Sequence, residues 1–259
     1  MKKNTSAFFK HLNAYFDAVY VISLERATER HAHVKKELEG LSYQLFYGVD
    51  KQNLDVEQLK KQGIYNEEKA IQNHRFTKPL LPGMIGCSWS HRNIYDDIIK
   101  NNYANALILE DDILIDDDTV IHFPEMMKEL PDDWELVYLG YARHESASLI
   151  NNLKKTAYHL QRLFGRHKFS HRTIHNLYPS RITNHVYKAG YHDQTHAYAV
   201  TRSGAAKLRK LQEPITFIAD NLLAYAATNE IIKAYIFKPK LINQLSQGFE
   251  KKTGTYIND

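Results

Sequence analysis

The sequence predicts an α/β fold with a largely parallel sheet. Short apolar runs rich in β-branched residues alternate along the chain with helical patterns, which is the arrangement of βαβ units. No repeat period or low-complexity tract interrupts them. The chain has 259 residues, 43% of them hydrophobic and 25% charged, with 11 Gly and 7 Pro. This composition is typical of a compact globular protein and excludes a disordered, collagen-like or coiled-coil architecture.

The chain opens with a predicted strand, helix and strand. Residues 18–24 (AVYVISL) are apolar on both alternating faces, as in a strand that is buried on both sides. Residues 26–39 have the apolar spacing of a helix, and Gly40 follows as its C-cap. A second strand is expected over residues 43–49. Residues 51–82 are charged and irregular, and their two prolines, at 79 and 82, should end any short helices there.

Two later helices are predicted from their N-terminal caps. Ser88 can cap a helix that runs to about residue 100. Asp118 can cap another that reaches Leu130, because Pro131 follows. The remaining elements expected from apolar patterning are a strand at 104–109, a strand at 134–139 that stops at Gly140, a strand at 195–201, a helix at 203–211 and a strand within 231–237.

The sequence favours a cytoplasmic location. Cys87 is the single cysteine and cannot form an internal disulfide, which fits a reducing compartment. The longest purely apolar run near the start, residues 18–22, is far below the ~20 residues that span a bilayer. Lys10 and His11 interrupt the apolar stretch after Phe9, so we expect no signal peptide.

Charge is distributed unevenly around a net charge of +4. Residues 1–150 hold 17 basic and 24 acidic side chains (−7), residues 151–190 hold eight basic and no acidic ones (+8), and residues 191–259 hold nine and six (+3). A segment without carboxylates is expected beside an anionic partner: phospholipid, phosphorylated glycan or nucleic acid. We expect it, together with basic and aromatic residues near the start of the chain (Lys2, Lys3, Phe8, Phe9 and Lys10), to dock on an anionic membrane surface, such as the cytoplasmic face of the inner membrane, or on a phosphorylated lipid-linked acceptor. The alternative is a solvated insert that binds nothing.

Three acidic residues, Glu110, Asp111 and Asp112, directly follow the predicted strand 104–109. Adjacent carboxylates repel one another and resist removal from water, so such a cluster persists either in full contact with solvent or around a divalent cation. Ligands of open α/β sheets bind beyond the carboxyl ends of strands, where this cluster falls. Glu110 and Asp112 should share one face while Asp111 points elsewhere. Oxygen-only ligands suit Mg²⁺ or Mn²⁺; the alternative is an acidic turn.

Residues 83–91 (GMIGCSWSH) hold two glycines ahead of the helix predicted from Ser88. Glycines at such a place permit close backbone approach and leave N–H groups free for a ligand. No Lys-Ser/Thr pair follows, so the stretch is not a phosphate-binding P-loop. By residue type, His91 fits a buried core histidine as well as a site residue. Cys87 is more typical of a small packing residue than of a nucleophile.

Four stretches of the chain, taken together, match a family pattern in the expected order. They are residues 21–24 (VISL) followed by Arg26 and Arg30; residues 83–91, close to G-x-I-G-C-x-x-S-H; residues 106–112, matching A-L-I-L-E-D-D; and Ala197-Tyr198 with Gly204-Ala205, matching A-Y-x-x-x-x-x-G-A. On these stretches the chain resembles the family 25 glycosyltransferases. That family includes lipopolysaccharide and lipooligosaccharide β-galactosyltransferases and the collagen β-galactosyltransferases.

The resemblance implies a GT-A type, Rossmann-like nucleotide-sugar-binding fold, with residues 1–259 as one domain and 151–190 as a basic insert. It implies an inverting transferase that moves a hexose, galactose rather than glucose, from a UDP-sugar to a hydroxyl of a lipopolysaccharide- or lipooligosaccharide-type glycan. The implied cofactor is a divalent metal, Mn²⁺ or Mg²⁺. Asp112 would be its main ligand, and Glu110 would contact a metal-bound water or the ribose.

The resemblance also implies the residues around the donor. Arg26 and Arg30 follow the first strand and would contact the uracil or the phosphates; a solvated helix face is the alternative for both. As the leaving UDP gains negative charge, such cations would stabilise it. The remaining donor-side residues carried over from the matched stretches are Ser23, Leu24, Ser90, Asp111 and Tyr198.

The implied general base is Asp220, an acidic residue near the start of a helix after the A-Y…G-A element. The chain departs here from the family's commoner Pro-x-Asp form, since Pro214 lies six residues upstream. A helix N-cap is the alternative role for Asp220. His91 and His196 are the other candidate bases. A positioned base is usually worth ~10²–10⁴ in rate.

Two other function classes stay open from the residues alone. A Mg²⁺-dependent phosphohydrolase would use the Glu110-Asp111-Asp112 cluster, but it needs an Asp nucleophile or a second metal cluster that the sequence does not reveal. A non-enzymatic module that binds an anionic polymer would use residues 151–190, where aromatic and basic residues interleave. The acidic first 150 residues argue against nucleic acid. We therefore expect a nucleotide-sugar donor and a glycan or glycolipid acceptor as partners, and no nucleic acid.

Overall fold

The structure is a computed structural model that describes residues 3–73, 77–142, 144–146, 149–166, 168–192 and 194–245. The strands of its main sheet are β1 (Ala18–Ser23), β2 (Gln44–Tyr47), β3 (Asn105–Glu110), β5 (Leu136–Ala142), β6 (Ser180–Arg181), β7 (Val186–Lys188), β8 (Gln194–Thr201) and β9 (Ala234–Phe237). A smaller pair consists of β4 (Ile113–Ile115) and β10 (Ile242–Gln244). The helices are α1 (Lys3–Tyr15), α2 (Thr28–Glu37), η1 (Lys51–Asn53), α3 (Val56–Lys61), α4 (Glu67–Asn73), α5 (Pro82–Lys100), η2 (Val120–His122), α6 (Phe123–Glu129), α7 (Leu149–Leu163), α8 (His171–His175), α9 (Arg202–Leu211) and α10 (Ala219–Thr228).

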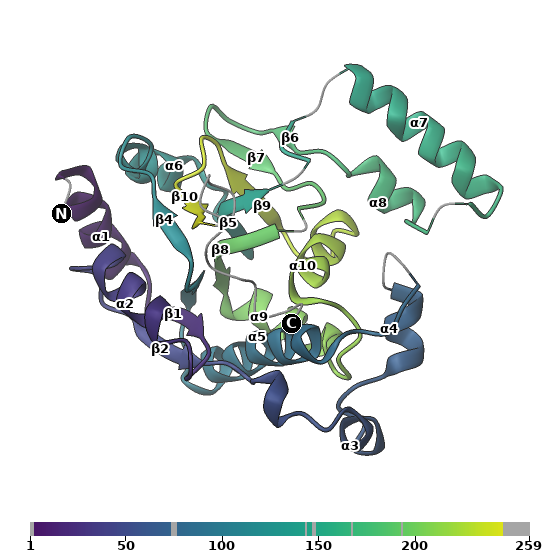
Figure 1. Cartoon of the computed structure of the whole chain (residues 1–259). Coiled ribbons are helices and arrows are strands. Elements are labelled where there is room, and N and C mark those ends of the chain that lie inside the picture. The colour runs from purple at the N-terminus through teal and green to yellow at the C-terminus, as the bar shows by residue number, and fades with distance from the viewer. Residues whose placement is uncertain are drawn as a thin grey trace.

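The α/β class expected from the sequence is confirmed (Figure 1). Within the described residues, the main sheet has the order β2-β1-β3-β8-β5-β9-β7-β6. Parallel pairing joins β1 to β2 and β3, and β5 to β9. Strand β8 runs antiparallel between β3 and β5, and β7 runs antiparallel to β9. The carboxyl ends of β1 and β3 therefore meet at one edge of a Rossmann-like sheet, which is where such folds bind ligands.

Side chains of the central strands alternate between two cores, one on each face of the sheet. On one face, Val21 of β1 packs in a cluster with Phe8 of α1 and Phe123 of α6. On the other, Tyr20 packs in a cluster with Ile94 of α5 and with residues of α9 and α10. This alternation is what the apolar pattern of residues 18–24 predicts. Both faces of β1 and β3 are thus buried, which holds their carboxyl ends in place.

The sequence predicts Ser88 as the N-cap of α5, but the helix begins earlier, at Pro82. Pro82, expected to end a helix, instead occupies the first turn of α5, where its missing N–H costs no hydrogen bond. Ser88 lies inside the helix, and its Oγ donates toward the carbonyl oxygens of Met84 (2.8 Å) and Phe217 (2.9 Å). Gly86 is helical too, and a Cβ there would lie 2.4 Å from the Val49 carbonyl oxygen. The prediction that both glycines precede the helix was wrong, because Gly86 lies inside it and serves close packing.

The helix before Pro131 also begins later than predicted. Asp118 does not cap it; instead, Asp116 Oδ1 accepts from the backbone N–H groups of Asp118 (3.2 Å) and Thr119 (3.3 Å). The short helix η2 follows this turn and leads into α6. Several neighbouring aspartates can form such a turn, so the sequence signal was ambiguous.

Strand β5 does not stop at Gly140 but continues to Ala142. A Cβ at position 140 would lie 2.5 Å from His196 Nε2 and 2.6 Å from the Ile242 carbonyl oxygen. Glycine at this position makes room for a buried histidine of the neighbouring strand and for β10.

Helices α1, α7 and α8 were not predicted from the sequence. Helix α1 buries Phe8, Phe9 and Leu12 against the sheet, so the expectation that Phe8 and Phe9 contribute to membrane docking was wrong. Helix α7 opens the basic segment 151–190 and projects from the rest of the molecule beside α8 (Figure 1). The same segment also contributes β7, which pairs with β9 of the main sheet. None of the helices in the described ranges is both long and apolar enough to cross a bilayer.

Candidate functional site

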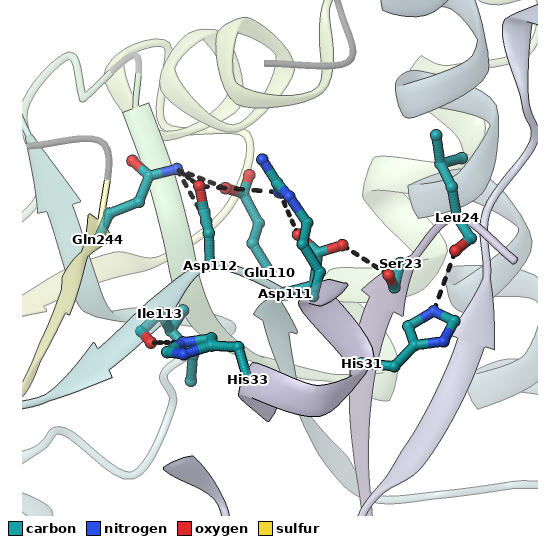
Figure 2. A network of polar contacts seen from close by, with 10 residues as sticks. Ser23, Leu24, His31, His33, Glu110, Asp111, Asp112, Ile113 and Gln244 are labelled. Carbon is teal, nitrogen blue, oxygen red and sulfur yellow. Dashed lines mark hydrogen bonds and ion pairs between the residues drawn. The ribbon is translucent and has the colours of Figure 1, made fainter. Parts of the chain in front are cut away.

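The ends of β1 and β3 bring Ser23 beside the acidic cluster. Ile22 pairs with Glu110 in the parallel register of the two strands. Ser23 Oγ donates a hydrogen bond to Asp111 Oδ2 over 2.5 Å (Figure 2). Arg30 of α2 forms an ion pair with the same carboxylate. Asp111 therefore points toward β1 and α2, and its charge is matched by a guanidinium.

Glu110 and Asp112 face the opposite way, toward Gln244 of β10 (Figure 2). Gln244 Nε2 donates to Glu110 Oε2 (2.9 Å) and to Asp112 Oδ1 (3.1 Å) and Oδ2 (3.2 Å). The antiparallel pairing of Gln244 with Ile113 positions this amide, and the Leu245 N–H donates to the Asp112 carbonyl oxygen over 2.8 Å. The predicted alternation of the three acids is thus present, and Gln244 joins them from 132 residues away.

The two facing carboxylates repel each other in a largely buried place. Burial raises the pKa of Glu110 well above its ordinary value, and the charges of Asp112, Asp220 and Asp111 raise it further, while Arg30 lowers it. Burial also raises the pKa of Asp112, which Arg30 and the Gln244 hydrogen bonds lower in part. Asp112 is only 5% exposed. The fold therefore holds negative charge here at a cost that a bound cation would remove.

Asp220 lies in the first turn of α10, close enough for its charge to act on Glu110 and on the Cys87 thiol. Its Oδ1 accepts from the N–H of Asn221 over 2.7 Å. Ile218 is the N-cap of this helix, so the alternative role of Asp220 as N-cap is wrong. The fold brings together two acids that are 110 positions apart, one at the end of β3 and one at the start of α10.

His91 and Tyr198 lie in the interior. His91 is 4% exposed, its Nδ1 is 2.7 Å from Tyr198 Oη, and Tyr198 Oη is 2.8 Å from Tyr95 Oη. Burial lowers the pKa of His91 to about 4. A histidine so buried is a weaker candidate for a base than half-buried Asp220, and its contact with Tyr198 fits a core histidine.

His196 is likewise a structural residue. It is 1% exposed, and its Nε2 is 2.9 Å from the Ile242 carbonyl oxygen of β10. Burial lowers its pKa to about 4. Because this contact holds β10, the strand that carries Gln244, His196 helps to position the site.

Three donor-side candidates make contacts within the protein. Ser90 Oγ accepts from the Val49 N–H (2.8 Å) and donates to the Gly86 carbonyl (2.7 Å). Arg26 Nε pairs with Asp50 over 2.5 Å, and this hydrogen bond is the chief cause that lowers the pKa of Asp50.

Leu24 accepts at its carbonyl oxygen from His31 Nε2 over 3.0 Å (Figure 2). These bonds shape the chain just after β1. A donor role for Ser90, Arg26 and Leu24 stays a prediction.

The acids at the end of β3 fit a hard divalent cation. Glu110 and Asp112 offer carboxylate oxygens on one face, which are ligands that Mg²⁺ and Mn²⁺ prefer. Their raised pKa values show that their charges are not fully compensated by the protein. Gln244 can turn its amide so that the oxygen, not the nitrogen, faces a cation. Its place on β10 carried no recognisable signal in the sequence.

A family model described as glycosyltransferase family 25 (LPS biosynthesis protein) matches residues 16–223. The chain belongs to glycosyltransferase family 25.

The chain spans less than a third of the length of the individual relatives that it matches. The chain is 27% identical to procollagen galactosyltransferase 1 of Danio rerio over 133 residues, which are 49% of this chain and 22% of that protein. It is 28% identical to a glycosyltransferase 25 family member of Anopheles gambiae over 205 residues, 75% of this chain and 28% of that protein. It is 30% identical to the inactive glycosyltransferase 25 family member 3 of Mus musculus over 137 residues, 48% of this chain and 22% of that protein.

The resemblance expected from the four motifs is thus confirmed, and so is the enzyme class, a glycosyltransferase. The matches cover between a fifth and a third of each of these relatives, so their activities are not assigned to this chain directly. Family membership favours a transferase over the phosphohydrolase and over the non-enzymatic binding module. Relatives named inactive or probably inactive are among the matches, so the geometry around Glu110 and Asp112 is the feature that bears most directly on activity.

Proposed function

We propose that this chain is an inverting hexosyltransferase that moves galactose, rather than glucose, from a UDP-sugar to a hydroxyl of a lipopolysaccharide- or lipooligosaccharide-type glycan. The family description names LPS biosynthesis, and several relatives are named galactosyltransferases. The observation that carries the proposal is the convergence of Glu110, Asp112, Gln244 and Asp220 at the carboxyl edge of the sheet.

Each of these residues has a physical task in such a reaction. Glu110 and Asp112 would hold Mn²⁺ or Mg²⁺, with Gln244 turning its amide oxygen toward the ion. When bound, the cation would neutralise charge on the donor diphosphate and on the leaving UDP. Arg30 lies 3.8 Å from Asp112 Oδ2 and, through its ion pair with Asp111, fixes the turn that carries these ligands.

Inversion requires the acceptor hydroxyl to attack from the side opposite the departing phosphate. A base on that side must take the hydroxyl proton, and half-buried Asp220 is our candidate. It approaches the acids from α10, whereas Arg30 approaches them from α2. Residues of α2 would thus lie on the donor side of Glu110, and Asp220 of α10 would lie on the acceptor side.

A pocket beside β6 and β7, several strands away from β3, is the candidate site for a distal, charged part of the acceptor glycan. It has a volume of about 560 Å³, within the usual range for small-molecule sites, and lies among α7, α8, β6 and β7. Its lining includes three cations, one carboxylate and two aromatic rings: Lys155, Arg181, Lys238, Glu145, Tyr178 and Tyr187. Aromatic rings suit the apolar faces of sugars, and the cations suit phosphate or carboxylate groups on a glycan. An acidic or phosphorylated glycan is therefore the acceptor class that we propose.

Helix α7 gives the proposed membrane contact a specific surface. Ile150, Leu153 and Leu160 of α7, and Phe164 just beyond its C-terminal end, lie three, seven and four positions apart, and each is more than half exposed. Segment 151–190 contains eight basic and no acidic residues. A basic helix with an apolar face binds in the plane of an anionic membrane, with ~1 kcal/mol per Lys or Arg near the surface. We propose docking on the cytoplasmic face of the inner membrane, where the glycolipid acceptor would be presented.

Sedimentation with lipid vesicles tests the membrane contact. We expect the chain to bind vesicles that contain phosphatidylglycerol and not those of phosphatidylcholine alone, with binding weakened by salt. Leu160→Ser should weaken binding several-fold, whereas the matched change at its exposed neighbour, Gln161→Ser, should not. Binding that ignores lipid charge, salt and Leu160 would refute this part of the proposal.

Release of UDP tests the transferase itself. The chain is incubated with UDP-galactose, UDP-glucose and other UDP-sugars, with and without Mn²⁺, in the presence of a lipooligosaccharide acceptor. We expect metal-dependent UDP release that is fastest with UDP-galactose, and a β-linked product by NMR, as inversion of an α-linked donor requires. Equal release from all donors, or full activity in EDTA, would contradict the proposal.

A further inference from the structure

Two histidines and a glutamate gather on elements that contribute none of the acids at the end of β3. His122 ends η2, Glu125 lies in the first turn of α6, and His185 immediately precedes β7. One potential ligand atom from each of these residues lies within 4.8 Å of the other two. His122 and Glu125 are three positions apart, so they share a face of the continuous η2–α6 turn. The third member comes from 60 positions further along the chain.

Glu129 orients His185 in a way that leaves a ring nitrogen for a ligand. His185 Nδ1 is 3.0 Å from Glu129 Oε1, and Glu129 Oε2 accepts from the His185 backbone N–H over 2.9 Å and from Thr183 Oγ1. When a carboxylate accepts from Nδ1–H, the lone pair of the imidazole is on Nε2. This carboxylate–histidine arrangement is the usual support of histidines that bind metals.

The two imidazoles are arranged side by side. The ring centroids of His122 and His185 are 5.5 Å apart and the ring planes differ by 22°. Both histidines are partly exposed and Glu125 is exposed, so a cation can reach them and Glu125 can change its rotamer. Ligand atoms around a tetrahedral ion with bonds of ~2.0–2.1 Å lie roughly 3.4 Å apart. A rotation of the Glu125 side chain and a small shift of the two rings would bring the three ligand atoms to this spacing.

The donor types indicate which cation fits. Two imidazole nitrogens and one carboxylate oxygen suit Zn²⁺, whereas Mg²⁺ and Ca²⁺ prefer oxygen only. We propose that His122, Glu125 and His185 form a Zn²⁺ site that joins α6 to the loop between β6 and β7. The site is separate from the carboxylates at the end of β3. A bound ion would hold the end of the basic segment against α6, next to the point where β7 pairs with β9 of the main sheet.

Zinc titration of the metal-free, full-length chain tests this site. Competition with a chromophoric chelator gives affinity and stoichiometry, and thermal unfolding gives an independent readout. We expect His122→Ala and His185→Ala each to lose one equivalent of bound Zn²⁺ and most of the zinc-dependent rise in Tm. Glu129→Gln should weaken zinc binding 10–100-fold, as expected for a residue that orients a ligand.

Two matched variants distinguish this site from zinc binding elsewhere on the chain. His11→Ala removes an exposed histidine of α1, and Asp112→Asn removes the main ligand of the proposed catalytic cation. Both variants should still bind the one equivalent of Zn²⁺ that the His122→Ala variant no longer binds. Unfolding in EDTA controls for misfolding, because His122→Ala should match wild type there. The proposal is overturned if wild type takes up no zinc that survives the chelator, or if the His122 and His185 variants bind it like wild type.

Discussion

Replacing Glu110 by Gln is expected to make the metal-free chain more stable at neutral pH. Burial, and then the charges of Asp112, Asp220 and Asp111, raise the pKa of the Glu110 carboxyl in the folded protein. A carboxyl with a raised folded pKa holds its proton more tightly in the folded than in the unfolded chain. The free energy of unfolding therefore falls as pH rises from the ordinary carboxyl pKa to the raised one, and it stays low above that. Below the ordinary carboxyl range Glu110 is protonated in both states, and it no longer destabilises the fold.

The size of the effect follows from the shift. Each unit by which the pKa is raised corresponds to about 1.4 kcal/mol at a pH above the folded value. For a chain of this size, 1 kcal/mol moves Tm by roughly 2–4 °C. Gln has nearly the shape of Glu and its amide oxygen can still accept from Gln244, so the gain should not be offset by a lost hydrogen bond.

Thermal unfolding in EDTA is the assay, at pH 7.5 and at steps down toward pH 4. Glu110→Gln should melt above wild type at pH 7.5, with the difference shrinking as pH falls. In saturating Mn²⁺ wild type should have the higher Tm of the two, because only wild type gains the full binding energy of the cation. Glu68→Gln, the same change at an exposed position of α4, should stay within a degree or so of wild type at every pH. A Glu110→Gln chain that melts below wild type in EDTA at pH 7.5 would refute the idea of uncompensated charge.

Three further predictions concern single residues. Asp220→Asn should lower kcat ~10²–10⁴-fold with little change in Tm, and near-normal turnover would remove it as the base. Gln244→Ala should raise the Mn²⁺ concentration needed for half-maximal activity 10–100-fold, and an unchanged requirement would show that its amide does not serve the cation. Gly86→Ala should lower Tm by several degrees, since a Cβ there would lie 2.4 Å from the Val49 carbonyl oxygen; overpacking of this kind costs about 1–3 kcal/mol, and a wild-type Tm would contradict the packing.

The central strands and the acidic cluster could be predicted because their signals are local. Residues 18–24 and 104–109 are short apolar runs, and three acids in succession after such a run mark the end of a strand. The register of β1 and β3 then brings Ser23 and Asp111 into contact, as parallel neighbours at one sheet edge should be.

What could not be predicted depends on contacts across the chain. Gln244 reaches the acids only because β10 pairs with β4, and a glutamine that follows Asn243 near the end of a short strand carries no signal. The helix start at Pro82 was missed because Ser88 has the residue type of a cap, although here its hydroxyl bonds back to the preceding turn. Glycine at 86 and at 140 reads as a loop or a strand end in one dimension, whereas both positions are close approaches between elements.

Calorimetric titration of UDP into the chain tests the central claim most directly, namely that Glu110 and Asp112 hold a cation against the diphosphate. With 1 mM Mn²⁺, wild type should bind UDP at least tenfold more tightly than in EDTA, and Asp112→Asn should abolish this difference while its unfolding in EDTA stays cooperative. Equal UDP affinity with and without Mn²⁺, or an undiminished effect of Mn²⁺ in Asp112→Asn, would contradict the account.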